Sequence, residues 1–315
     1  MKRRSFPQDF HLSRAEFLKL GAAAGVSLVC GGTLSWAAEN ALSTRPIPKS
    51  GESLPVVGLG TARVFDVSGT PEELAPRKEV LRLLFAAGGS VIDTAPSYGQ
   101  AETVVGDLLA ELGAQEKAFV ATKVNARGRE NGIDQMEDSM RKLRSKRIDL
   151  LQVHNLVDTA TQLKTLREWK EKGRIRYIGV THFSPEASER LAQLIQTEPV
   201  DFVQAQYSLE VRQAEARLLP LAADRGVAVL VNLPFGRGRL FQAVQGRKLP
   251  PWAAEFDCTS WGQLFLKYLL SNKAVTCVIP GTAKPSHLLD NLAAGRGRLP
   301  DAAGRQRIVD FWRSL

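Results

Sequence analysis

The sequence predicts an α/β fold, a single (β/α)8 TIM barrel with a β-hairpin before it and an extra helix after it. Eight short apolar runs alternate with segments of helical periodicity, which is the pattern of a parallel barrel. Composition is uniform after the first 45 residues, and the remaining length suits a barrel of about 250 residues. We therefore predict one barrel domain over residues 45–315.

The hairpin and the first helix are predicted from turn and cap residues. Segments 44–48 and 54–57 flank the turn-forming run 49–53, which indicates a hairpin. Thr70, Pro71 and Glu73 are suited to be the N-cap, first-turn proline and capping-box acid of a helix over residues 71–87. Pro76 leaves open a later start for this helix.

The barrel strands are predicted from β-rich apolar runs bounded by glycine, proline or polar residues. They span residues 56–61, 90–93, 118–123, 148–154, 175–181, 202–206, 227–232 and 275–279. The first is glycine-rich, which allows close approach of a ligand to the backbone at Gly60 and Thr61.

The remaining helices follow from apolar spacing and from capping residues. One begins after Gln100, one opens at Ser184-Pro185, and the others span residues 134–144, 159–172, 214–225, 261–270 and 301–314. The stretch 233–260 between the seventh strand and its helix is long, which is typical of a lid, a binding loop or disorder.

Three successive predicted strands end in residues that carry chemistry. Asp93, Lys123 and His154 lie at these ends, and Tyr98 lies in the loop after the first. Taken singly, each has an ordinary explanation as a turn former, a solvated lysine or a buried histidine. Together they gather at the face where α/β barrels keep their active sites, and this favours a catalytic group.

The motifs Asp93-Thr-Ala-Pro-Ser-Tyr98-Gly99, Thr122-Lys123 and Gln152-Val-His154-Asn155 resemble those of the aldo/keto reductase family. The resemblance covers residues 46–291 and implies a barrel that binds a nicotinamide cofactor without a Rossmann domain. It implies that Tyr98 donates a proton to a carbonyl oxygen. Lys123 would lower the pKa of that phenol, Asp93 would hold the ammonium, and His154 would orient the carbonyl.

The resemblance also implies a set of cofactor contacts. Thr181, His182 and Gln204 would hold the nicotinamide carboxamide, although His182 stands where the family usually has Asn. The nicotinamide-stacking loop contributes Asn232, Pro234 and Gly236, and the adenosine-phosphate site contributes Thr282, Lys284, His287 and Asn291. Asn232 stands where the family has an aromatic residue in this loop, and Phe235 is the candidate to supply the aromatic ring instead. NADP(H) is preferred and NAD(H) remains possible, because Lys284 or His287 can meet a 2′-phosphate.

Composition and charge limit the kinds of partner that we predict for this protein. A net charge of +9 is spread along the chain without aromatic interleaving, which favours an anionic cofactor over nucleic acid. The predicted partner is a small-molecule carbonyl substrate. Of three cysteines, Cys258 and Cys277 follow the leader, and they form neither a metal motif nor a disulfide framework.

Residues 1–37 have the layout of an export signal. A basic start precedes a Gly/Ala-rich run over residues 20–38, and Ser35-Trp36-Ala37 offers a cleavage site. Segment 13–19 resembles a twin-arginine motif with Ala15 in place of the second Arg, so the twin-arginine export machinery and a periplasmic location are predicted. A membrane tether or a misassigned start is the alternative, with a cytoplasmic location. No stable membrane span is expected in the mature form.

Two other readings remain open. A nicotinamide-binding sensor with little turnover is motivated by His182 and Asn232. A metal-dependent barrel hydrolase would use Asp93, His154 and His182 as ligands, but it leaves Lys123 and Tyr98 without a role. We predict no metal.

Overall fold

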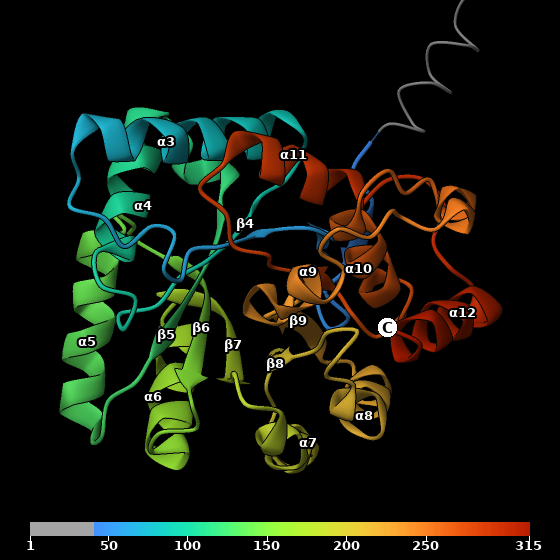
Figure 1. The fold of residues 1–315 in the computed structure, drawn as a ribbon. Helices are drawn as coiled ribbons and strands as arrows, with labels where there is room; N and C mark the ends of the chain where they lie inside the picture. The colour runs from blue at the N-terminus through green and yellow to red at the C-terminus, as the bar shows by residue number, and fades with distance from the viewer. Residues whose placement is uncertain (1–40) are drawn as a thin grey trace, which may run out of the picture. The chain divides into compact units, whose positions relative to one another are not determined.

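Eight parallel strands form the centre of the molecule. The computed structural model describes residues 41–315, which form one compact unit. The strands hydrogen-bond in the order β10-β9-β8-β7-β6-β5-β4-β3. Parallel bridges from Val57 to Val278 and from Gly60 to Gly281 join the two ends of this order. The predicted (β/α)8 barrel is therefore confirmed, with helices between its strands (Figure 1).

The barrel strands lie close to their predicted positions. They are β3 (Leu59–Gly60), β4 (Val91–Asp93), β5 (Phe119–Val124), β6 (Ile148–His154), β7 (Ile175–His182), β8 (Phe202–Gln206), β9 (Ala228–Asn232) and β10 (Cys277–Val278). The first and last are much shorter than the apolar runs that predicted them. At those positions the two strands meet through isolated bridges instead of a continuous ladder.

The helices alternate with the strands. They are α3 (Pro71–Ala86), α4 (Ala101–Glu111), α5 (Arg129–Lys142), α6 (Thr159–Glu171), α7 (Ser188–Thr197), α8 (Leu218–Asp224), α9 (Arg239–Ala243), α10 (Trp261–Leu270), α11 (Pro285–Ala293) and α12 (Ala302–Arg313). Helix α12 is the extra C-terminal helix that the sequence predicts, and Asp301 caps it by accepting from the Gly304 N–H at 2.8 Å.

Several helix boundaries differ from the prediction, for local reasons. Helix α3 begins at Pro71 and includes Pro76, so the later start does not occur. Helix α5 begins at Arg129 instead of at residue 134. The sequence does not predict its first turn, because that turn is polar and carries no apolar periodicity. Ser184 opens a 3-10 turn, Pro185–Ala187, before α7, and its side chain does not cap that turn.

A hairpin packs against one end of the barrel interior. Strands β1 (Thr44–Pro46) and β2 (Ser53–Pro55) pair antiparallel, which confirms the predicted hairpin. Ile47 and Leu54 from this hairpin are buried in one cluster with inward-facing side chains of the barrel strands, among them Phe119 and Phe202. Apolar side chains therefore fill the end of the barrel where the strands begin.

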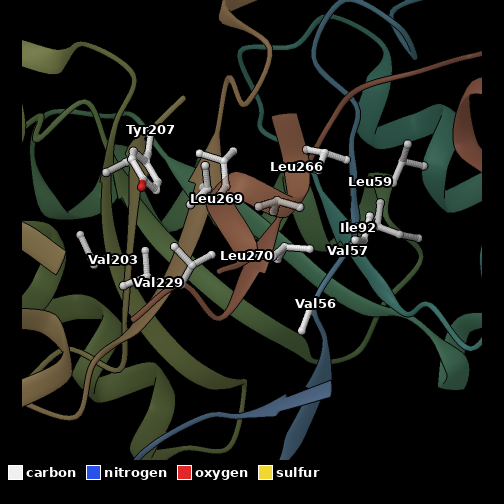
Figure 2. Packing of buried hydrophobic residues seen from close by; sticks show 14 of the residues in the cluster. Val56, Val57, Leu59, Ile92, Val203, Tyr207, Val229, Leu266, Leu269 and Leu270 are labelled. Atoms are coloured by element: carbon white, nitrogen blue, oxygen red, sulfur yellow. The ribbon is translucent and has the colours of Figure 1, made fainter. Parts of the chain in front are cut away.

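A second and larger cluster lies between the strands and the helices. Figure 2 shows Leu266, Leu269 and Leu270 of α10 in this cluster with Val203 and Val229 of the strands. Burial of these side chains holds the strand ends in place, and the strand ends carry the predicted catalytic residues. Among residues 41–315, no helix has the length and hydropathy to cross a membrane. The predicted export signal lies outside the described residues.

Candidate active site

The four predicted catalytic residues come together at one end of the barrel. Asp93 ends β4, Lys123 is the penultimate residue of β5, and His154 ends β6. These strands are adjacent in the sheet, and Tyr98 lies in the loop that follows β4. The Lys123 Nζ lies 4.9 Å from the centre of the Tyr98 ring, and the Tyr98 and His154 rings lie 6.1 Å apart.

Asp93 and Lys123 form a buried ion pair. The Lys123 Nζ donates to Asp93 Oδ2 at 2.8 Å and to the Thr94 carbonyl at 2.7 Å, and the Lys123 side chain is 1% exposed. The second Asp93 oxygen accepts from Gln204 Nε2 at 2.7 Å. Both oxygens of the carboxylate are thus engaged, and the ammonium is held in one place.

The pKa of Tyr98 is set by opposing influences. Burial raises it above its ordinary value, and the positive charge of Lys123 acts in the opposite direction. Lys123 therefore acts with the predicted sign, but burial outweighs it. Burial alone would lower the pKa of Lys123, yet attraction to Asp93 and Tyr98 raises it above its ordinary value. At neutral pH the site therefore holds a protonated phenol beside an ammonium.

His154 is neutral at the same pH. Burial, together with the positive charges of Lys123 and His182, lowers the pKa of His154 to about 3. Its Nδ1 lies 3.5 Å from the Ser97 Oγ, at the outer limit of a hydrogen bond. A neutral imidazole has one N–H donor and one acceptor nitrogen, so His154 can donate to a ligand without carrying charge.

The loop that carries Tyr98 is fastened to the loop after β3. The Asp66 Oδ1 accepts from the Gln100 N–H at 2.9 Å. Gly99 adopts φ +59°, and a Cβ at this position would lie 2.0 Å from Asp66 Oδ1. Only glycine fits here, because the backbone is left-handed and the carboxylate is in the way. The phenol is thus positioned by both loops.

A cavity of about 670 Å³ opens at this end of the barrel, within the range of small-molecule sites. Asp93, Tyr98 and His154 line it. The other predicted residues that line it are Gly60, Thr181, Gln204, Asn232 and Pro234. These residues come from both halves of the chain and meet only because the sheet closes.

Other predicted cofactor residues do not line this cavity. Thr61 is buried and bonds the Asp93 carbonyl through its Oγ1 at 2.9 Å. His182 accepts from the Ser184 N–H through Nδ1 at 3.0 Å, and Gly236 lines a neighbouring cavity of about 290 Å³. In the predicted adenosine-phosphate site, Thr282 and Lys284 lie just before α11, His287 lies in its first turn, and Asn291 is buried near its C-terminal end. That segment follows Gly281, which does line the main cavity.

Two residues that were predicted to contact a ligand have partners within the protein. The Gln204 Oε1 accepts from Thr181 Oγ1 at 3.0 Å, and its amide nitrogen donates to Asp93. A Cβ at Gly60 would lie 2.7 Å from the Ile279 carbonyl oxygen. Glycine at position 60 is therefore required by the neighbouring strand end, and Gly60 also lines the cavity.

Several cavity residues were not predicted. Asn155, Arg63, Asp66 and Phe241 line the cavity, and the Asn155 Oδ1 is buried without a partner among the described residues. The position of Asn155 directly after a strand-ending histidine was a usable signal. Asp66 gives no such signal, because its partner Gln100 is 34 positions away. The first part of stretch 233–260 lines the cavity and is helical in places, which favours the binding-loop reading.

A model of the aldo/keto reductase family matches residues 56–305. The chain belongs to this family. The exported subgroup that the sequence analysis predicted is not tested, because the signal lies outside the described residues.

Two curated relatives illustrate the range within the aldo/keto reductase family. The chain is 31% identical over 201 residues to the aldo-keto reductase YhdN of Bacillus subtilis, with 58% of this chain and 59% of the relative aligned. It is 25% identical over 269 residues to the NADH-specific methylglyoxal reductase of Escherichia coli, with 68% of this chain and 81% of the relative aligned. The alignment thus spans less than two thirds of the length of YhdN.

The fold also matches solved aldo/keto reductases. One is the crystal structure of an aldo/keto reductase from Klebsiella pneumoniae in complex with NADP and acetate. It is 23% identical, with a TM-score of 0.70, and the match covers 83% of this chain and 93% of that chain. At this level of identity the likeness supports the fold alone.

Proposed function

We propose that this aldo/keto reductase reduces an aldehyde or ketone to an alcohol with NADPH, using Tyr98 as the general acid. The single observation that carries the proposal is the placement of the Tyr98 ring 4.9 Å from the buried Lys123 ammonium, at the wall of a cavity. A phenol has an ordinary pKa of about 10 and needs a nearby positive charge to release its proton readily. Lys123 supplies that charge.

Each side chain has a defined task in this reaction. When bound, the reduced nicotinamide supplies a hydride to the carbonyl carbon. Negative charge then develops on the carbonyl oxygen, and Tyr98 transfers its proton to that oxygen. The Lys123 ammonium stabilises the phenolate that remains, and Asp93 holds the ammonium. Neutral His154 orients the carbonyl by donating a hydrogen bond.

The residues at the cavity suit a nicotinamide cofactor. The Asn232 Oδ1 is buried without a partner among the described residues, and a carboxamide N–H can satisfy it. Phe183, Phe235 and Phe241 line the same cavity and offer aromatic surface for a flat ring. Thr181 and Asn232 are the proposed carboxamide contacts. The contacts of His182, Gln204 and Gly236 with the cofactor remain predictions.

NADP(H) is the proposed cofactor, with NAD(H) as the alternative. The Klebsiella pneumoniae structure holds NADP, whereas the Escherichia coli relative is named as NADH-specific. In this chain Lys284 and His287 are exposed at the start of α11 and are available to a 2′-phosphate. The ratio of kcat/KM for NADPH and NADH measures this preference.

The test is a panel of simple aldehydes and ketones assayed with NADPH on the wild type and on Tyr98→Phe. The variant keeps the ring and removes the proton, so we expect kcat to fall about 10²-fold or more, with cofactor binding retained. Phe311 on α12 does not line the cavity, so Phe311→Tyr is the matched control and should leave kcat unchanged. Equal rates for the wild type and Tyr98→Phe would overturn the proposal.

A sensor that binds the cofactor with little turnover is the second candidate. It is favoured by Asn232, which stands where an aromatic stacking residue is expected and bonds the Gln204 Oε1 at 3.4 Å. Stopped-flow absorbance of bound NADPH with excess aldehyde separates the two. Tight NADPH binding without oxidation supports the sensor, and rapid oxidation supports the reductase.

We also propose that residues 45–315 are the reductase domain and that residues 1–37 act as an export signal. The basic start and the small residues before Ala38 support this assignment. Fusion of the first 44 residues to a reporter active only outside the cytoplasm measures export, and a silent reporter would favour a cytoplasmic location.

A further inference from the structure

Arg63 is a cation at the cavity wall that the proposed reaction does not use. It lies in the loop between β3 and α3, it is exposed, and it lines the 670 Å³ cavity. Among the ion pairs formed within residues 41–315, none involves Arg63. A guanidinium in this setting offers its donors to a ligand.

The backbone at Arg63 adopts a conformation that arginine rarely takes. Its φ is +64°, in the left-handed region that disfavours residues with a Cβ. Eight non-glycine residues of the described chain have positive φ, and four of them line this cavity: Arg63, Asn155, Leu233 and Arg237. Unfavourable backbone conformations thus concentrate around the cavity, as they do at ligand sites.

Neighbouring contacts fix the loop in this conformation. The Thr61 N–H and Oγ1 both donate to the Asp93 carbonyl, at 3.0 and 2.9 Å. Arg77 Nε donates to the Val64 carbonyl at 2.6 Å, and Asp66 holds the Gln100 N–H. Arg63 therefore sits on a fixed loop, between two attachments to the segment that carries Tyr98.

The second arginine of the cavity lies in a different environment. The Arg237 guanidinium lies 5.7 Å from the centre of the Phe183 ring, which follows β7. Phe183 lies two residues after Thr181, one of the residues proposed for the cofactor. Arg63 instead belongs to the loop that is attached to the Tyr98 segment through Thr61 and Asp66, so the two arginines lie on different segments of the cavity wall.

The acidic residues of the cavity do not neutralise Arg63. Asp93 is paired with Lys123. The Asp66 carboxylate also lines the cavity, where its Oδ1 accepts from the backbone of Gln100, and it forms no ion pair with Arg63. Among the residues that the structure describes at the cavity, Arg63 is thus a cation on the loop attached to the Tyr98 segment, and its guanidinium is available to a negatively charged group.

From this arrangement we infer that the substrate is a carbonyl compound bearing a carboxylate, and that Arg63 binds the carboxylate while Tyr98 protonates the carbonyl oxygen. This inference rests on the proposed reductase activity. A guanidinium binds a carboxylate through two parallel N–H donors, which fixes the direction of the substrate as well as its affinity.

The experiment compares acids with their neutral esters. Rates are measured with NADPH for para- and meta-carboxybenzaldehyde and for the methyl esters of both. We expect the wild type to favour at least one acid over its ester by about tenfold in kcat/KM, mainly through KM. Added salt should reduce that preference, because Arg63 is exposed.

The variants are chosen so that folding is retained. Arg63→Asn suits the left-handed backbone and should bring the acid-to-ester ratio close to one, with KM for NADPH unchanged. Arg63→Lys keeps the charge and should keep part of the ratio. The matched control is Arg190→Gln on α7, which removes an exposed charge at a position that does not line the cavity. It should leave the acid-to-ester ratio unchanged.

Three results would overturn the inference while the reductase proposal stands. They are equal rates for acid and ester in the wild type, an unchanged ratio in Arg63→Asn, or a rise in KM for NADPH as the only effect of that variant. Failure of the wild type with both acids and both esters, while it reduces carbonyls of the simple panel, would also overturn the inference alone. Failure with every one of these compounds would overturn both proposals.

Discussion

His154 shows at the residue scale how burial sets the charge that the chemistry needs. Its pKa is lowered to about 3, mainly by burial, whereas an unfolded histidine titrates near 6.5. The unfolded state therefore binds more protons than the folded state between these two values. The stability associated with neutral His154 is fully present above pH 6.5 and is lost as the pH falls toward 3.

We predict that the free energy of unfolding decreases by at most about 1.4 kcal/mol per pH unit below pH 6.5 on account of His154. Urea unfolding at pH 7, 6 and 5 measures the slope. His154→Gln removes the titrating group and should reduce the slope over the same range. An identical slope in both proteins would contradict the assignment of this effect to His154.

At this scale the sequence predicted where Asp93, Lys123 and His154 lie, because each position follows from a local pattern. Asp93 and His154 end apolar runs, and a run that is continuous in sequence is continuous in the strand. The direction in which the pKa of Tyr98 shifts was less predictable. The position of Lys123 predicted a lower pKa for Tyr98, yet burial raises it, and burial is a property of the surrounding fold.

At the element scale, two loops are coupled by one carboxylate. Asp66 follows β3 and accepts from the Gln100 N–H at the start of α4, beside Gly99. The loop with Tyr98 therefore depends on a residue from the preceding βα unit. No local pattern indicates this contact, since the two residues belong to different elements.

We predict that Asp66→Ala lowers kcat about tenfold, because a small displacement of the phenol weakens proton transfer. Asp66→Asn keeps an oxygen acceptor for Gln100 and should retain most of the activity. The loss of stability in Asp66→Ala should be about 1 kcal/mol, as expected for one exposed hydrogen bond. Steady-state kinetics and urea unfolding of both variants separate the two effects. Equal kcat in the two variants would contradict a positioning role.

At the scale of the whole molecule, the barrel has one packed end and one open end. Ile47 and Leu54 of the hairpin fill the end where the strands begin, together with Phe119 and Phe202. The polar residues Asp93, Lys123 and His154 lie at the other end, beside the cavity. Stability and chemistry are therefore separated along the strands.

We predict that Leu54→Ala destabilises the protein by about 2–5 kcal/mol and leaves kcat close to the wild-type value below the unfolding temperature. Leu54 is 2% exposed and packs in the barrel interior. Leu289→Ala, at a side chain that is 47% exposed, is the control and should change stability by less than about 0.5 kcal/mol. A kcat that falls in proportion to stability would argue against this separation.

The sequence by itself determined the strand and helix alternation, the hairpin, the final helix and the positions of Asp93, Tyr98, Lys123 and His154. Each depends on apolar spacing or on residues close together in the chain. Only the tertiary structure decided that Gln204 bonds Asp93, that Asp66 holds the Tyr98 loop and that Arg63 faces the cavity. These contacts join residues from different elements, which closure of the sheet brings together, and local sequence does not specify them.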